Sequence, residues 1–284
     1  RWAGKLLLVN TSGYLPWGDT VHKDEFGHIY ELGRVIDVFI DGGNHGLFIH
    51  EDDRKELIQG LECAYGTSGG FWVYPPQHWD RHRWFLPYVD RSIKHLRQLH
   101  VDGGTACELY LGPLMNPGTQ MSILCGGIFL QDAGVDCLSV MEHAIDLLYR
   151  PGNGNARANL ADVFLGAERA FFQNWSERRI EPSASDYSDG ISELFRWSAQ
   201  TPERAIPGEL FLEPLMADRP GFPVYLAVHM TGDGRREYRR RLTSLLADAR
   251  TLSGDFRDEG RVSRIASCIE NVIEDIDLVE DKLK

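Results

Sequence analysis

Short apolar strand patterns and helical patterns alternate through residues 1–118, and this alternation limits the possible folds more than any other feature of the sequence. The expected strands are residues 5–10, 35–41, 70–74 and 105–111, and the expected helices between them are residues 24–32, 51–61 and 84–100. Strands that are joined through helices run parallel, with right-handed crossovers. Four such units make half of an eightfold barrel, so the sequence predicts an α/β fold, the carboxyl-terminal half of a (β/α)₈ TIM-type barrel.

The rest of the chain has a nearly continuous helical pattern. Residues 119–230 are expected to form a helical extension, with helices at 121–130, 138–149 and 156–175 and a long Pro- and Gly-rich loop at 207–228. Residues 231–284 are expected to form an antiparallel helical hairpin with a coiled-coil seam. Its apolar residues alternate spacings of three and four, at Tyr238, Leu242, Leu245, Ala249 and Leu252 and at Val262, Ile265, Ile269, Val272, Ile276, Val279 and Leu283. The hairpin either packs on its own barrel or joins two copies in a homo-oligomer.

Composition argues against several classes of partner. The formal net charge of −12 disfavours nucleic acid, and we interpret the arginines of residues 235–241 as a solvated helix face. No apolar run approaches the roughly 20 residues that span a bilayer, so no membrane partner is expected. Five cysteines without a CxxC spacing predict free thiols and a reducing, cytoplasmic location. Because the chain begins at Arg1, we expect a preceding barrel half, on the same or another chain, to complete the sheet.

The candidate catalytic residues are carboxylates at the ends of the expected strands. In a barrel, strand residues alternate between the interior and the helix layer, and function gathers at the carboxyl ends of strands. In the second strand Ile36, Val38 and Ile40 are expected to meet the helices, which leaves Asp37, Phe39 and Asp41 inside. In the fourth strand Cys107 is expected on the helix side and Glu108 inside. We therefore predict Asp41 and Glu108 as acid, base or stabilising carboxylates. Asp37 is expected to pair with an interior Arg or Lys.

A set of aromatic and polar residues surrounds these carboxylates in the expected barrel mouth. Aromatic rings stack on the apolar faces of sugars, and Asn and His bind hydroxyl groups. The predicted sugar-binding residues are Asn10, Asn44, His45, Trp72, Tyr74, His78, Trp79 and Tyr110. The tryptophans, with Trp84, are equally compatible with packing roles.

Two other motifs are weaker. Residues 66–70 match the G-x-S-x-G pattern of esterase-type serine hydrolases, which needs a strand before it and a helix after it. Here a helix is expected before it and a strand after it, so Ser68 would lie at the wrong end of its strand. His78 and His82 lie four residues apart without an H-E-x-x-H motif, so neither a metal site nor a cofactor is expected.

Part of the chain resembles a known group of proteins. The similar segments are residues 88–96, 103–108, 116–117 and 128–130, Asp136, and residues 149–151, within a match that covers residues 70–175. They resemble the end of the barrel in glycosidase-like proteins, including uncharacterised barrel domains similar to α-glucuronidases and β-hexosaminidases. The resemblance implies that Glu108 ends the last barrel strand, and it departs from the group where Arg150 follows Tyr149 in place of Gly. We expect a carbohydrate-active hydrolase that cleaves glycosidic bonds. The alternative is a non-catalytic carbohydrate-binding or scaffold subunit.

Overall fold

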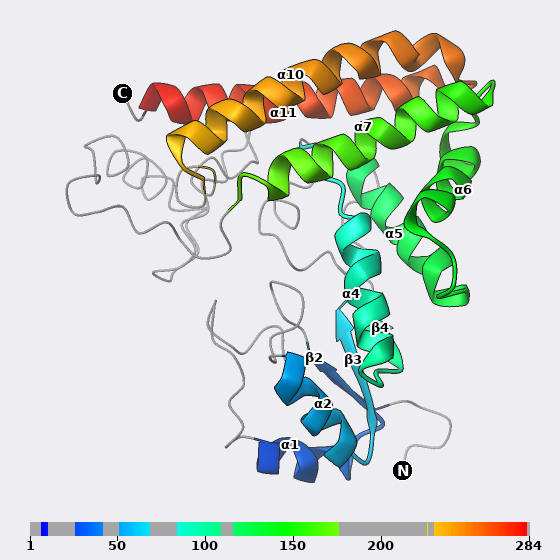
Figure 1. Cartoon of the computed structure of the whole chain (residues 1–284), viewed down its shortest axis with the longest axis vertical. Helices are drawn as coiled ribbons and strands as arrows, with labels where there is room; N and C mark the ends of the chain where they lie inside the picture. Colours follow the sequence, from blue (N-terminus) through cyan, green and yellow to red (C-terminus); the bar gives the residue numbers. More distant parts are fainter. Residues whose placement is uncertain are drawn as a thin grey trace.

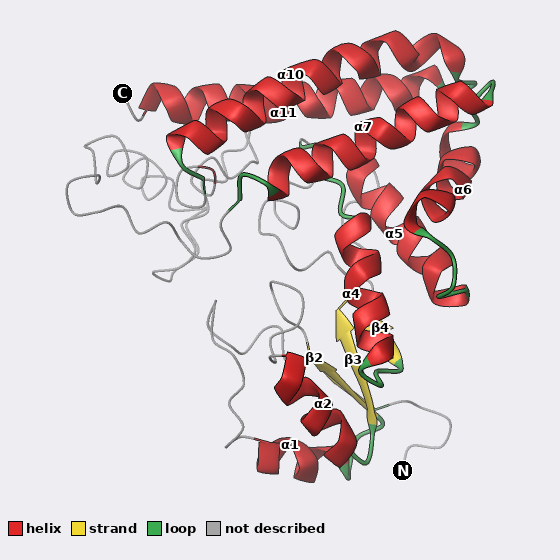
Figure 2. Cartoon of the chain, in the orientation of Figure 1, coloured by secondary structure: helices red, strands yellow, loops and turns green. Residues whose placement is uncertain are grey.

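The amino-terminal part of the chain forms a parallel sheet, and the carboxyl-terminal part forms a layer of long helices (Figures 1 and 2). A computed structural model describes residues 7–10, 26–41, 51–68, 84–108, 116–175, 226 and 230–282. Within these residues the sheet has four strands, β1 (Leu8–Asn10), β2 (Val38–Asp41), β3 (Ala64–Ser68) and β4 (Ala106–Glu108), in the order β1-β2-β3-β4. Every neighbouring pair is parallel. The predicted α/β class is therefore confirmed.

Three helices of this part contact one face of the sheet. They are α1 (Phe26–Gly33), α2 (Glu51–Gly60) and α4 (Asp90–Val101). Phe26, Leu57 and Leu99, one from each helix, pack in a single buried cluster with Phe39 of β2 and Tyr65 of β3. Strands in sequential order with helices on one face follow from consecutive right-handed crossovers that proceed in one direction.

The third strand lies earlier in the sequence than predicted. Residues 70–74 were expected to form it, but β3 is Ala64–Ser68, and residues 70–74 lie outside the described ranges. Residues 64–68 include a glycine, a threonine and a serine, so they lack the apolar alternation that marks a strand. Pairing with β2 and β4 overrides this weak propensity. A Cβ atom at Gly66 would lie 2.5 Å from the carbonyl oxygen of Ala106, so the close approach of β3 to β4 requires glycine here.

The expected orientation of β2 is also wrong. Phe39 was predicted to face away from the helices, but it is buried among helix residues, 6.1 Å from the Tyr65 ring between centroids. Asp37 was predicted to form an interior ion pair. It is instead exposed at the amino end of β2, where its carboxylate accepts a hydrogen bond of 2.9 Å from the N–H of Leu7.

The helical layer contains α5 (Pro117–Gln131), α6 (Cys137–Tyr149), α7 (Gly154–Phe172), α10 (Gly232–Leu252) and α11 (Glu259–Lys282), with a short 3₁₀ turn at Ser253–Asp255. Side-chain oxygens cap four of these helices at their amino ends, from Asn116, Asp136, Asn153 and Thr231. These caps explain why the helices begin where they do. All five cysteines are free thiols, as predicted. Within the described ranges, none of the helices combines the length and apolar character needed to cross a membrane.

The hairpin of α10 and α11 lies along α7 (Figure 1). The seam residues of α11 from Val262 to Val279 are fully buried within the chain, as are Tyr238 and Leu242 of α10. The seam is therefore used to pack the hairpin on its own chain, and it is not available as the surface that joins two copies.

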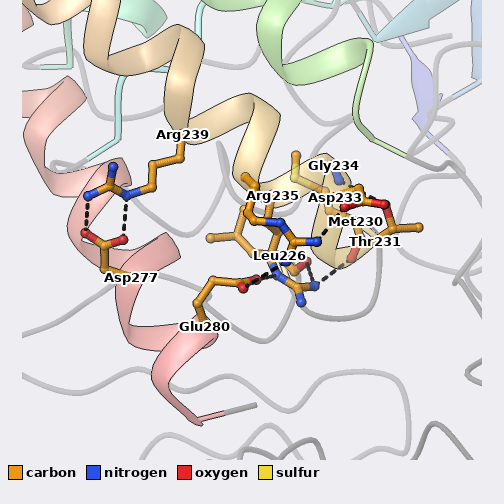
Figure 3. A network of polar contacts seen from close by, with 10 residues as sticks. Leu226, Met230, Thr231, Asp233, Gly234, Arg235, Arg239, Asp277 and Glu280 are labelled. Carbon is orange, nitrogen blue, oxygen red and sulfur yellow. Dashed lines mark hydrogen bonds and ion pairs between the residues drawn. The ribbon is translucent and has the colours of Figure 1, made fainter. Parts of the chain in front are cut away.

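The arginines of α10 are not all solvated, as Figure 3 shows. Arg239 forms two hydrogen bonds of 2.6 and 2.9 Å with Asp277 at the surface. Arg235 is buried, and its guanidinium donates to the carbonyl oxygens of Leu226 (3.2 Å) and Met230 (2.6 Å) and forms an ion pair with Glu280. The interpretation as a solvated face is thus wrong for Arg235, which fixes the start of α10 to the end of α11.

Candidate functional site

Each strand of the sheet ends in a polar residue, and the register brings these four ends to one edge. Asn10, Asp41, Ser68 and Glu108 are the last residues of β1, β2, β3 and β4. Asp41 is paired with Thr67, and Ser68 is paired with Glu108. The carboxyl edge of a parallel sheet is the usual position of ligand sites in α/β proteins.

The spacing of the strands sets the distance between the two candidate carboxylates. Neighbouring strands lie about 4.8 Å apart, so the backbones of β2 and β4 are separated by about 10 Å. β3 lies between them and contributes Ser68 to the same edge. The backbone arrangement therefore places Asp41 and Glu108 at one edge, two strands apart.

The reason for the predicted sheet face holds for Glu108 but fails for Asp41. Cys107 packs against the helical core, as expected, which keeps the reason for placing Glu108 on the opposite face. The reason for placing Asp41 there was that Phe39 faces away from the helices, and this is wrong. By the same alternation, Asp41 belongs to the face of Phe39 and Glu108 to the opposite face. The prediction that both carboxylates face the interior thus loses its basis for Asp41, while the shared edge remains.

Ser68 is a candidate that the sequence reasoning set aside. It was expected at the wrong end of its strand, yet it is the carboxyl-terminal residue of β3. A local signal could have indicated this. Both β2 and β3 end in a polar residue that two glycines follow, Asp41 before residues 42–43 and Ser68 before residues 69–70.

The remaining predicted sugar-binding residues lie outside the described ranges. They are Asn44, His45, Trp72, Tyr74, His78, Trp79 and Tyr110. In the part of the chain that the structure describes, no group of three or more His, Cys, Asp or Glu side chains could hold a metal ion.

A buried ion pair links the first turn of α2 to the carboxyl end of α4. Arg54 of α2 donates from Nε to Asp102 at 2.7 Å, and a second guanidinium nitrogen contacts the same carboxylate. Gln98 also donates to Asp102 at 2.9 Å, and the Lys55 ammonium lies 3.7 Å from it. Because Asp102 follows α4 directly, this pair ties α2 to the turn that leads into β4.

Glu168 of α7 has the burial and the raised pKa that are common in catalytic acids, but its contacts indicate a structural role. It is 2% exposed, and burial raises its pKa to about 7, against the opposing effect of its hydrogen bonds. Its Oε2 accepts from the N–H groups of Val89 (2.7 Å) and Asp90 (3.1 Å), and Oε1 accepts from Arg91 (2.8 Å). Val89 provides no side-chain cap for α4. Glu168 therefore caps α4 from a distant helix.

Trp84 also has a packing role, one of the two that the sequence allowed. It is 1% exposed, and its indole N–H donates to the buried carboxylate of Asp275 in α11 at 2.7 Å. Its own carbonyl oxygen accepts from the Asn116 side chain at 2.6 Å.

Comparison of the chain with protein-family models, with curated proteins and with solved structures gives no match.

Proposed function

We propose that this chain is the carboxyl-terminal half of a (β/α)₈-type barrel that hydrolyses glycosidic bonds, with Asp41 and Glu108 as its carboxylates. The observation that supports this proposal is the parallel register, which sets Asn10, Asp41, Ser68 and Glu108 at one edge of the sheet. Function in parallel α/β barrels gathers at this edge.

The exposed outer strand of the sheet, β1, favours a larger barrel. β1 is the first strand of the described sheet, and Leu7 and Leu8 are 49% and 42% exposed. Long exposed strand edges are a liability that proteins usually cover. We propose that a preceding barrel half, on the same or another chain, pairs with β1.

The proposed chemistry uses one carboxyl group to protonate the leaving oxygen and the other as base or nucleophile. Carboxyl separations of about 5–5.5 Å accompany retention and about 6.5–9.5 Å accompany inversion. The separation of the two carboxyl groups in the completed barrel would therefore decide the stereochemical outcome. Ser68, paired with Glu108 in the register, would hold this carboxyl or a sugar hydroxyl by a hydrogen bond.

Hydrolysis of a panel of aryl glycosides by the chain together with its preceding half tests the proposal. Asp41→Asn and Glu108→Gln keep the side-chain shape but remove acid–base function, so each should lower kcat by about 10²–10⁴-fold and leave glycan affinity nearly unchanged. Asp37→Asn is the matched control, because this carboxylate lies exposed at the opposite end of β2. It should leave kcat unchanged.

Two results would redirect the proposal. Glycan binding without turnover in the parent protein would support the non-catalytic, carbohydrate-binding alternative. Neither binding nor turnover in the completed barrel would refute a role in carbohydrate chemistry.

A second candidate, an esterase-type hydrolase, is favoured by one observation, the position of Ser68 at the carboxyl end of β3. Hydrolysis of a p-nitrophenyl ester that Ser68→Ala abolishes, in a protein that does not turn over aryl glycosides, would support it over the glycosidase.

A further inference from the structure

Two adjoining hollows lie where the carboxyl end of α6 meets the first turn of α11. These two helix ends lie at the end of the helical layer where α7 begins (Figure 1). Their volumes are about 310 and 250 Å³, and both are lined by Asp258 and Arg261. The segments that form them are joined by backbone hydrogen bonds, from the N–H of Gly152 to the Asp255 carbonyl (2.8 Å) and from the N–H of Arg257 to the Arg150 carbonyl (3.3 Å). The hollows are thus built between two connected turns.

Four arginines line these hollows, Arg150, Arg257, Arg261 and Arg264, and we call the two hollows together the arginine hollow. The one carboxylate in its lining, Asp258, forms an ion pair of 3.0 Å with Arg261. No ion pair joins the other three arginines to a carboxylate of the described ranges. Glu259 lies in the first turn of α11 but lines neither hollow. The arginine hollow is therefore a concentration of positive charge in a chain whose net charge is −12.

The amino ends of two helices add to this positive potential, whereas the carboxyl end of α6 opposes it. Gly260, Arg261 and Arg264 belong to the amino end of α11, and Pro117 at the start of α5 also lines the second hollow. Amino ends of helices carry partial positive charge and favour bound anions.

One residue of the lining has a buried hydroxyl without a partner in the described ranges. Tyr149 lines the second hollow and is 1% exposed, and its hydroxyl has no hydrogen-bond partner among the described residues. Burial raises the pKa of Tyr149, and the charge of Arg261 acts on it in the opposite direction. A buried hydroxyl without a partner is unfavourable, and an anion that accepts its hydrogen bond would remove this cost.

Arg150 occupies a position that normally suits glycine. It ends α6 with φ 52° and ψ 65°, in the left-handed region, and among the described residues it is the one non-glycine with positive φ. Glycine would adopt this conformation without strain. An arginine here places a guanidinium in the lining of the hollow at a cost in stability.

We propose that the arginine hollow binds a phosphate group, either free or as the terminal group of a phosphomonoester. Guanidinium groups form paired, charge-assisted hydrogen bonds to phosphate oxygens, and the Tyr149 hydroxyl donates one more. This site is independent of the proposed function at the edge of the sheet.

Calorimetric titration of the full chain with inorganic phosphate and with phosphoserine tests the proposal, against sodium chloride at matched ionic strength. We expect saturable binding of one phosphate group per chain. If inorganic phosphate binds as well as phosphoserine, the ligand is the phosphate group alone. If phosphoserine binds more tightly, the organic part also contacts the protein. Absence of saturable binding for both would overturn the proposal.

Three variants separate binding from structure. Arg150→Gly should weaken phosphate binding about tenfold, the loss of a charge-assisted contact, while it raises the melting temperature of the ligand-free protein. Tyr149→Phe should likewise weaken binding severalfold and raise that melting temperature, because it removes a buried unpaired hydroxyl. Arg240→Gln is the control, since it removes one positive charge from an exposed residue that pairs with Glu237 on α10. Equal phosphate affinity in the parent and in Arg150→Gly would overturn the proposal.

Discussion

Replacing Glu168 by Gln tests how a buried carboxyl can cap a helix. In the folded protein burial raises the pKa of Glu168 to about 7, whereas the unfolded chain has the ordinary value of 4.5. The folded state therefore holds this proton more tightly. The carboxyl contributes its stabilisation below pH 4.5 and loses it as the pH rises through 7. Each unit of pKa difference corresponds to about 1.4 kcal/mol, so the loss between pH 5 and pH 8 is about 2.5 kcal/mol.

The glutamine variant has no proton to titrate at this position. It keeps one oxygen acceptor, but its amide nitrogen cannot accept from the backbone, so one N–H of the first turn of α4 loses its partner. At pH 5 we expect the parent to be more stable by about 1–2 kcal/mol. As the pH rises to 8, this difference should fall by about 2.5 kcal/mol.

Urea unfolding, followed by far-ultraviolet circular dichroism at several pH values, gives the free energy of unfolding for both proteins. Glu237→Gln is the control, because hydrogen bonds from Arg240 and Arg241 lower the pKa of Glu237 to about 2, below the range measured. Its stability difference from the parent should be flat from pH 5 to 8. The stability difference between the parent and Glu168→Gln could instead grow with pH. The three N–H donors would then lower the pKa of Glu168 more than burial raises it, and the reasoning would be wrong.

Two further substitutions test the sheet. Arg54→Met leaves the carboxylate of Asp102 buried without its main partner. It should lower the free energy of unfolding, measured in urea, by about 3–5 kcal/mol. A decrease below about 1 kcal/mol would contradict a buried pair. Gly66→Ala places a Cβ atom 2.5 Å from the Ala106 carbonyl oxygen and should cost about 1–3 kcal/mol, whereas Gly127→Ala, with no atom within 4 Å, should stabilise α5 by up to about 1 kcal/mol. Equal melting temperatures for the two alanine variants would argue against the close approach of β3 and β4.

The sequence predicted the long helices well, because their apolar periodicity extends over several turns. The expected ranges 138–149 and 156–175 correspond closely to α6 (Cys137–Tyr149) and α7 (Gly154–Phe172). The heptad pattern of α11 predicted which residues are buried, but it could not say against what. A seam that binds a second copy and one that packs on α7 have the same spacing.

The sheet was harder to predict because its strands are short. Residues 35–41 include apolar residues on both faces, and Val38, Phe39 and Ile40 are all at least 90% buried. Alternation therefore gave no reliable indication of which face meets the helices. β3 was missed for the opposite reason, since its hydroxyl and glycine residues give it almost no apolar pattern.

Contacts between distant segments could not be predicted from local patterns, and they decide how the candidate site is held. The amino end of α4 is capped by Glu168 of α7, and Trp84, six residues before the helix, donates to Asp275 of α11. At its other end α4 leads through Gly103, with φ 100°, into β4, which ends at Glu108. Since the helical layer fixes the helix that delivers β4, the position of Glu108 depends on residues far outside the sheet. The helical layer is therefore part of the framework of the proposed site, and loosening the cap at Glu168 should alter the geometry at the carboxyl edge as well as the stability of the fold.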